Sequence, residues 1–290
     1  MKIGTSTYSF LRLMRNGMTL EEVIHKTKEY GYDHIELGGL RPPDGMDIFE
    51  YAAHLRQCCA DVGLNIGAYT VGADFLYGGE SKDLDQESAR LKKEVDVAVA
   101  LGVDRLRHDV IPWSFQGPGS YRLVENAIAP LVRDLAEYAY TKGVQTMVEN
   151  HGYFIQESDR MVSLIEKVDH PNFGACVDIG NFLCADDDPI YAVSQLAAYA
   201  LHVHVKDFLW KDGAAPSPGS DWLITRGGHH IRGTILGHGV VPIPQCARIL
   251  KNAHFSGGFS LEFEGPEESD HALKASYEYL CRIKNELSWI

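Results

Sequence analysis

The sequence predicts an α/β protein: a single (β/α)8 (TIM) barrel over residues 1–290, with an extended loop after the seventh strand. Short apolar or β-branched runs alternate with helical patterns along the whole chain, giving eight strand–helix units. Glycines follow several of the helices, as expected for short connections with a left-handed residue at the helix end; they are Gly31, Gly63, Gly102 and Gly143. No G-x-G-x-x-G motif follows the first strand, which argues against an open dinucleotide-binding sheet.

The first half of the chain supplies the first three units and the fourth strand. Thr19 and Glu22 form a capping box at the first helix, and Asp47 caps the second. The third helix ends at Gly102, and its apolar residues recur at helical spacing at Leu91, Val95, Ala98 and Val99. We expect strands at 3–7, 34–37, 64–70 and 103–107, and the first two helices at 19–29 and 47–62.

The second half continues the alternation. We expect helices at 121–142, 157–168, 189–198, 242–253 and 267–286, and strands at 144–149, 173–178, 200–205 and 258–262. Regular alternation implies parallel strands joined by right-handed crossovers, and eight such units suit a closed barrel. The segment 207–241 is much longer than the other connections and is rich in Gly, Pro, Trp and His. Long connections in compact domains are usually functional, so we expect a partial lid over the site.

The composition narrows the class of partner. The chain has 27 basic and 40 acidic residues, a net charge of −13, which disfavours nucleic acid and anionic membranes. Its six cysteines form no C-x-x-C pair, so we expect free thiols in a reducing compartment. No signal-peptide pattern and no apolar run of about 18 residues is present, so we expect a cytoplasmic protein without a membrane span.

Four polar residues close four successive predicted strands: Glu149, Asp178, His204 and Glu262. The carboxyl ends of barrel strands meet on one face, so these side chains converge there. Taken singly, each has an ordinary alternative as a helix cap or a rim ion pair. Three carboxylates together repel one another, and a cation removes that repulsion. Oxygen-rich ligation with one histidine predicts one divalent metal, Mn²⁺ or Mg²⁺ first, with Co²⁺ or Zn²⁺ as alternatives.

Several neighbours are candidate substrate contacts. Lys206 shares a strand face with His204, where it would hold a substrate hydroxyl or oppose developing negative charge or, alternatively, form a rim ion pair with Asp207 or a neighbour. His202 shares that face deeper in the barrel, as a hydrogen-bonded core histidine. At the end of the fourth strand either Arg107 or His108 points into the site, and we favour His108.

Three further residues lie on predicted connections at the same face. His151, directly after the fifth strand, is a candidate second acid or base. Arg232 and Trp113 lie on long connections where they would contact a substrate, although such residues are more often ordinary loop structure. No Walker loop is present, so we expect an unphosphorylated substrate.

The order and spacing of these motifs resemble the xylose isomerase-like superfamily of sugar isomerases and epimerases. Locally they are similar to the barrel subunit of C-glycoside deglycosidases, in the segments 106–110, 149–152, 178–182, 203–208, 235–239 and 261–265. The resemblance implies that Glu149, Asp178, His204 and Glu262 bind a divalent metal, most often Mn²⁺. Ketose epimerases tend to carry histidine three residues after the aspartate, whereas this chain has Asn181, which we expect to contact substrate.

The resemblance implies a metal-dependent isomerase or epimerase that moves a proton through an enediolate, with Glu149 and Glu262 as proton carriers. The alternative is a metal-dependent lyase on 3-keto sugars, of the C-glycoside deglycosidase or inosose dehydratase type. A remote alternative is an apurinic endonuclease-like repair enzyme, against which the acidic charge argues. We expect a small-molecule sugar, polyol or sugar-derivative partner, of at least hexose size given the long segment 207–241. We also expect a homo-oligomer, or a hetero-oligomer with a small subunit for the deglycosidase type.

Overall fold

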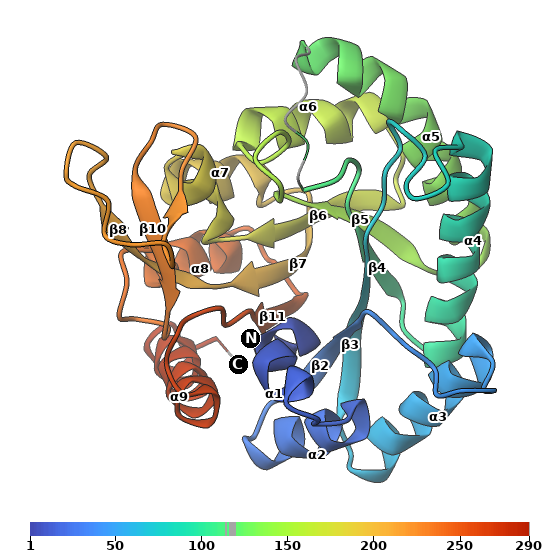
Figure 1. Ribbon diagram of the computed structural model, residues 1–290, viewed down its shortest axis with the longest axis horizontal. Helices are drawn as coiled ribbons and strands as arrows, with labels where there is room; N and C mark the ends of the chain where they lie inside the picture. Colours follow the sequence, from blue (N-terminus) through green and yellow to red (C-terminus); the bar gives the residue numbers. More distant parts are fainter. Residues whose placement is uncertain (114, 116–119, 290) are drawn as a thin grey trace.

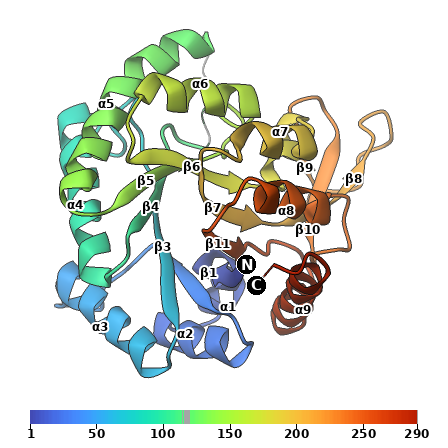
Figure 2. The same ribbon diagram turned by 180° about the vertical axis from the view of Figure 1, so that it is seen from behind.

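The computed structural model describes residues 1–113, 115 and 120–289. Eight parallel strands close into a barrel in the order β1-β11-β7-β6-β5-β4-β3-β2. Opposite views show helices surrounding these strands (Figures 1 and 2). The strands are β1 (Lys2–Ser6), β2 (His34–Gly38), β3 (Asn65–Val71), β4 (Arg105–His108), β5 (Gln145–Glu149), β6 (Phe173–Asp178), β7 (Ala200–Val205) and β11 (Gly258–Leu261). The predicted single (β/α)8 barrel is confirmed.

The long helices lie where the sequence pattern predicts them, within a few residues at the ends. They are α2 (Leu20–Glu29), α3 (Ile48–Asp61), α4 (Leu84–Leu101), α5 (Tyr121–Thr141), α6 (Ser158–Val168), α7 (Pro189–Leu196), α8 (Ile243–Asn252) and α9 (Ser269–Glu286). The capping box of Thr19 and Glu22 is formed at α2. Short helical turns that the sequence analysis did not predict follow β1 and β6: η1 (Thr7–Phe10), α1 (Leu11–Arg15) and η2 (Asn181–Ala185).

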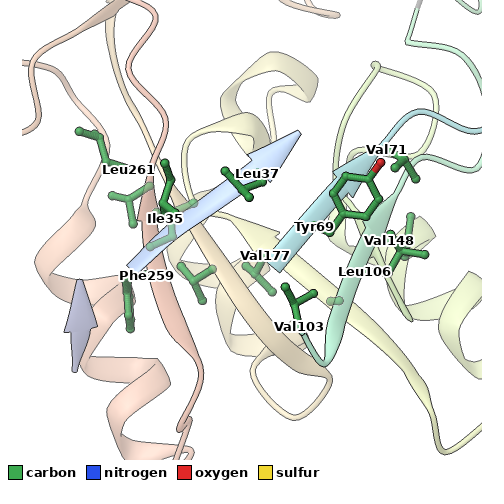
Figure 3. Close-up of a cluster of buried hydrophobic side chains, with 14 of the residues drawn as sticks. Ile35, Leu37, Tyr69, Val71, Val103, Leu106, Val148, Val177, Phe259 and Leu261 are labelled. Atoms are coloured by element: carbon green, nitrogen blue, oxygen red, sulfur yellow. The ribbon is translucent and has the colours of Figure 1, made fainter. Parts of the chain in front are cut away.

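Apolar strand residues form the layer between barrel and helices. Figure 3 shows labelled members of this layer, among them Ile35 and Leu37 of β2 and Phe259 and Leu261 of β11. Residues alternate across a strand, so the intervening positions face the barrel interior. These interior positions are largely polar or small, so the functional groups lie on the strand faces that point into the barrel.

The lower interior of the barrel is filled around His34. A Cβ added at Gly4, Gly67 or Gly258 would meet the His34 ring at 2.3, 2.3 and 2.7 Å. Glycine at these positions therefore makes room for the imidazole. Above it, Ala68, Met147 and Cys176 form a small apolar cluster, and the polar site lies at the carboxyl ends of the strands.

The long segment after β7 contains a three-stranded antiparallel sheet, which the sequence analysis treated as a loop. Its strands are β8 (Asp207–Lys211), β10 (His230–Thr234) and β9 (Leu223–Ile224), in that spatial order, and the sheet lies beside the barrel on the left of Figure 1. Tyr153 Oη donates to the Ile224 carbonyl at 2.8 Å, and an Arg226 guanidinium nitrogen lies 2.7 Å from Glu157. These contacts fix the sheet to the loop after β5.

Asp207 organises the base of this sheet. Its Oδ1 accepts from the amides of Phe208 and Val241 at 2.9 and 3.1 Å, and its Oδ2 accepts from those of Gly237 and Gly239 at 2.8 and 2.9 Å. Lys206 therefore does not pair with Asp207; its ion pairs are with two other carboxylates, Asp178 and Glu262.

Two general expectations can be compared with the structure. All six cysteines are free thiols, as predicted. Over the described ranges, no helix combines the length and the apolar character that crossing a membrane requires.

Candidate metal centre

The four predicted ligands meet at the carboxyl end of the barrel. Glu149, Asp178, His204 and Glu262 each offer a ligand atom, and these atoms lie within 4.8 Å of one another. His204 Nδ1 is 3.2 Å from Glu149 Oε1 and 3.4 Å from Glu262 Oε1. All four side chains are buried. The structure therefore brings together the whole predicted set.

Two buried atoms in this cluster have no hydrogen-bond partner: His204 Nδ1 and Asp178 Oδ2. The other Asp178 oxygen, Oδ1, accepts from the amides of Gly180 and Asn181 at 2.8 and 2.9 Å. Asn150 holds the Asp178 backbone in place through hydrogen bonds of 2.8 and 2.9 Å. Buried polar atoms are rarely left unpaired. A cluster of carboxylate oxygens and one imidazole nitrogen, with unpaired atoms among them, fits a divalent cation.

A fifth buried group, Glu36, was missed by the sequence analysis. His204 Nε2 lies 2.9 and 3.1 Å from the two Glu36 oxygens. His202 Nε2 lies 3.1 Å from the same carboxylate and 2.8 Å from Ser260 Oγ. His202 is thus the hydrogen-bonded core histidine that was predicted. Glu36 lies between the apolar residues Ile35 and Leu37, and this alternation was the signal that places it inside the barrel.

Arg107, and not His108, points into the site. Arg107 Nε donates to Glu149 Oε2 at 2.6 Å, and Nη2 lies 3.1 Å from Asp109 Oδ1. His108 packs against Phe75 and Phe173, with ring centroids 5.7 and 5.9 Å apart. The prediction that His108 faces the site is therefore wrong. The physical reason is strand alternation: His108 shares a face with Leu106, which packs outward under the helices.

Lys206 lies among the predicted ligands. Its Nζ is 2.9 Å from Glu262 Oε2 and 3.0 Å from Asp178 Oδ2, although the Asp178 contact lacks hydrogen-bond geometry. Burial opposes the charge on Lys206, but the carboxylates of Asp178 and Glu262 outweigh it and hold the pKa of the lysine well above its ordinary value. A fixed ammonium group therefore borders the cluster.

A cavity of about 770 Å³ opens above these residues. Several predicted site residues line it, namely Glu149, Glu262, His151, Asn181, Lys206 and Trp113. Tyr8 and Glu264, which the sequence analysis did not single out, line it as well, and Tyr8 Oη donates to Glu264 Oε2 at 2.8 Å. The cavity is large enough for a sugar-sized ligand in contact with the cluster.

Two of these lining residues are held by neighbours that bear on their chemistry. Asn181 Nδ2 donates to Glu149 Oε1 at 3.1 Å. His151 Nδ1 lies 3.0 Å from Asp109 Oδ1. Burial lowers the pKa of His151, but the hydrogen bond to Asp109 and the charges nearby outweigh burial, so its pKa is raised.

Arg232 is not brought to the cavity. It lies on β10, where Nη1 is 2.9 Å from Asp221 Oδ2 and the guanidinium is 5.0 Å from the Trp222 ring centroid. Among the residues that the structure describes in the segment 207–241, Leu223 lines the cavity. The structure does not support the prediction that Arg232 contacts the substrate. Arg232 lies in a sheet that was not predicted, and its side chain contacts Asp221 and Trp222 there.

Comparisons with known proteins agree with this architecture. The family model described as xylose isomerase-like TIM barrel matches residues 24–283. Inosose dehydratase 2 of Bacillus cereus is 24% identical over 160 residues, which are 54% of this chain and 51% of that protein. The chain thus aligns with about half the length of this curated relative.

Two solved structures show the same fold at low identity. A structure of the IOLI protein with a zinc atom has a TM-score of 0.77 at 14% identity and covers 100% of both chains. A structure of L-ribulose 3-epimerase has a TM-score of 0.75 at 15% identity, covering 99% of this chain and 96% of that one. Because the family model spans most of its length, the chain belongs to the xylose isomerase-like TIM barrel family.

Proposed function

We propose that this protein is a divalent-metal-dependent enzyme that isomerises or epimerises a sugar or sugar derivative by proton transfer through an enediolate. One observation carries the proposal. Glu149, Asp178, His204 and Glu262 converge beneath a sugar-sized cavity, with Asp178 Oδ2 and His204 Nδ1 buried and without a hydrogen-bond partner. A divalent cation there supplies a Lewis acid that stabilises the oxygens of an enediolate.

The two glutamates are held differently, which suggests different parts in the reaction. Glu149 is engaged by Arg107 at one oxygen and by Asn181 at the other. Glu262 contacts Lys206 and His204 and lines the cavity. We assign proton abstraction to Glu262, the carboxylate with fewer hydrogen bonds. In an isomerisation the same Glu262 carboxyl group returns the proton to the neighbouring carbon of the enediolate, whereas return on the opposite face, in an epimerisation, would require Glu149 to take up a proton from solvent first.

Two positively charged side chains, Lys206 and Arg107, bear on the negative charges of the reaction. The Lys206 ammonium lies beside the carboxylates and faces the cavity, where it would stabilise a substrate oxygen that becomes negative. Arg107 keeps Glu149 ionised and fixed in one orientation. Both positive groups are built into strand ends and need no rearrangement when substrate binds.

Elimination is the second candidate, because the curated relative is an inosose dehydratase. The first step is the same abstraction of a proton next to a carbonyl. A leaving hydroxyl or aglycone then needs a proton donor at the next carbon. His151 lines the cavity and is oriented by Asp109, so it is placed to act as that donor.

The test compares products. Separate samples loaded with Mn²⁺, Mg²⁺, Co²⁺ or Zn²⁺ are incubated with free ketoses, inososes and 3-keto glycosides, and the products are analysed by mass spectrometry. Isomerisation conserves mass, dehydration loses water, and deglycosidation releases an aglycone. We expect mass-conserving turnover of a ketose that a Glu262→Gln variant lacks. Water loss or aglycone release would favour the elimination candidate, and no metal-dependent turnover of any class would contradict both.

A further inference from the structure

Beneath the ligand cluster, a chain of buried polar groups runs down the barrel axis. Glu36 contacts His204 and His202, and Ser260 contacts His202 and His34. All five side chains are buried, and they come from β2, β7 and β11. The metal ligand His204 stands at the upper end of this chain.

The contacts of His204 distinguish its two ring nitrogens. Nε2 lies 2.9 and 3.1 Å from the Glu36 carboxylate oxygens, so the proton of a neutral imidazole resides on Nε2 and is donated to Glu36. In that tautomer Nδ1 carries the lone pair. Nδ1 is also the atom without a hydrogen-bond partner, and it faces Glu149 and Glu262. Metal-binding histidines generally donate their second nitrogen to a carboxylate or carbonyl in this way.

Glu36 is itself held firmly. Thr70 Oγ1 donates to Glu36 Oε1, and His202 Nε2 lies 3.1 Å from Oε2. The carboxylate therefore has neighbours on both oxygens and has little freedom to rotate away from His204. Replacing this group would change the orientation and basicity of His204 without touching the ligand cluster directly.

We propose that Glu36 is a positioning residue that fixes the Nε2–H tautomer of His204 and so presents Nδ1 to the divalent cation. This inference rests on the proposed metal-dependent function for the identity of the ligand. The trio Glu36, His202 and His204 also has spacing that would suit a metal, but the atoms that face one another, the Glu36 oxygens and the Nε2 atoms of both histidines, are already in mutual contact. The trio is therefore a hydrogen-bonded support and not a second metal site.

The first measurement needs no metal. Long-range ¹H–¹⁵N NMR on protein with ¹⁵N-labelled histidine reports which ring nitrogen carries the proton, and loss of signals in a His204→Gln variant assigns them. We expect a proton on His204 Nε2 in the wild type. A His204 with a bare Nε2 and its proton on Nδ1 would overturn the proposal whatever the protein binds.

The second measurement is divalent affinity, by calorimetric titration of metal-free protein with MnCl₂ and ZnCl₂. Glu36→Gln keeps the shape of the side chain but removes its charge, and we expect affinity to fall about 10- to 100-fold. The matched control is Ser260→Ala, which removes hydrogen bonds from His202 and His34 but leaves the pair of Glu36 and His204 intact; its affinity should stay within about threefold of the wild type.

Three results separate the outcomes. Unchanged affinity in Glu36→Gln, with the wild type binding normally, would overturn the positioning role. Two cations per wild-type chain, with one lost in His202→Gln, would overturn the assignment of the trio as a support. If the wild type binds no divalent cation, the proposed function fails, and the NMR result alone decides whether Glu36 orients His204.

Discussion

The guanidinium of Arg107 lies against the carboxylate of Glu149, with Nε 2.6 Å from Oε2, and both side chains are buried. Burial alone would raise the pKa of Glu149, but Arg107 and His204 beside it hold that pKa well below its ordinary value. Arg107 also contacts Asp109, which orients His151. The Arg107 guanidinium thus links Glu149, a predicted metal ligand, through Asp109 to His151, a candidate proton donor.

We predict that Arg107→Met destabilises the protein by about 3–5 kcal/mol, because it leaves Glu149 and Asp109 buried without their cation. Activity should fall sharply as well, since Glu149 loses its fixed orientation. Urea denaturation and turnover measure the two effects. The comparison variant is His108→Gln at the neighbouring position, which should lose stability but keep kcat/KM within about threefold, because His108 packs outside the cavity. Equal losses of activity in both variants would contradict this division.

The role of Glu262 predicts solvent exchange. Glu262→Gln should lose more activity than its loss of metal affinity explains, because the amide cannot accept the substrate proton. In D₂O, the wild type should incorporate deuterium at the substrate carbon next to the carbonyl, as read by mass spectrometry. Turnover without incorporation would point to transfer shielded from solvent or to a hydride shift. Full activity of Glu262→Gln at full metal occupancy would remove the proposed role of Glu262.

Strand alternation explains both what the sequence predicted and what it missed. Alternating apolar residues locate the strands, and a polar residue at the last inward position locates Glu149, Asp178, His204 and Glu262. The same rule applied to Leu106 would have chosen Arg107 over His108. Applied to Ile35 and Leu37, it would also have placed Glu36 inside the barrel.

The sheet after β7 could not be predicted in the same way. Its strands are short, and β9 covers only Leu223–Ile224. The sheet depends on pairing between distant residues, such as His230 with Lys211 and Ile224. Such pairing leaves no local periodicity, so the position of Arg232 away from the cavity was not readable from the sequence.

The hydrogen bonds of Asp207 lead us to predict that substituting this residue destabilises the sheet after β7 locally. In Asp207→Asn, an amide group replaces one of two oxygens that together accept four backbone N–H groups. At least one buried donor loses its partner, at a cost of about 1–3 kcal/mol. Hydrogen exchange should rise in the segment 207–241 and not in the barrel strands. Asp212→Asn, at an exposed position, is the control and should show no such rise; uniform exchange in both variants would refute the local role.

We predict that His34 makes the folded protein less stable at acidic pH. Burial lowers its pKa to about 3 in the folded protein, whereas an unfolded histidine has a pKa of about 6.5. Between these values the unfolded chain binds the proton and the folded chain does not. Stability from this residue therefore falls as the pH drops below about 6.5, by about 1.4 kcal/mol per pH unit.

Urea denaturation between pH 4 and 7 measures that slope. His34→Gln should be less stable at pH 7 but should lose less stability on acidification than the wild type. The exposed His271→Gln variant serves as control and should keep the wild-type slope. If His34→Gln and the wild type showed the same slope, His34 would not be the buried neutral histidine described above.

The central claim is that Glu149, Asp178, His204 and Glu262 together bind one divalent cation. Its most direct test is metal analysis by mass spectrometry after equilibration with equimolar Mn²⁺ and removal of free ions. The account predicts one cation per wild-type chain and substantial loss in both Glu149→Gln and His204→Ala, with the fold retained by circular dichroism. Full metal occupancy in both variants would contradict it.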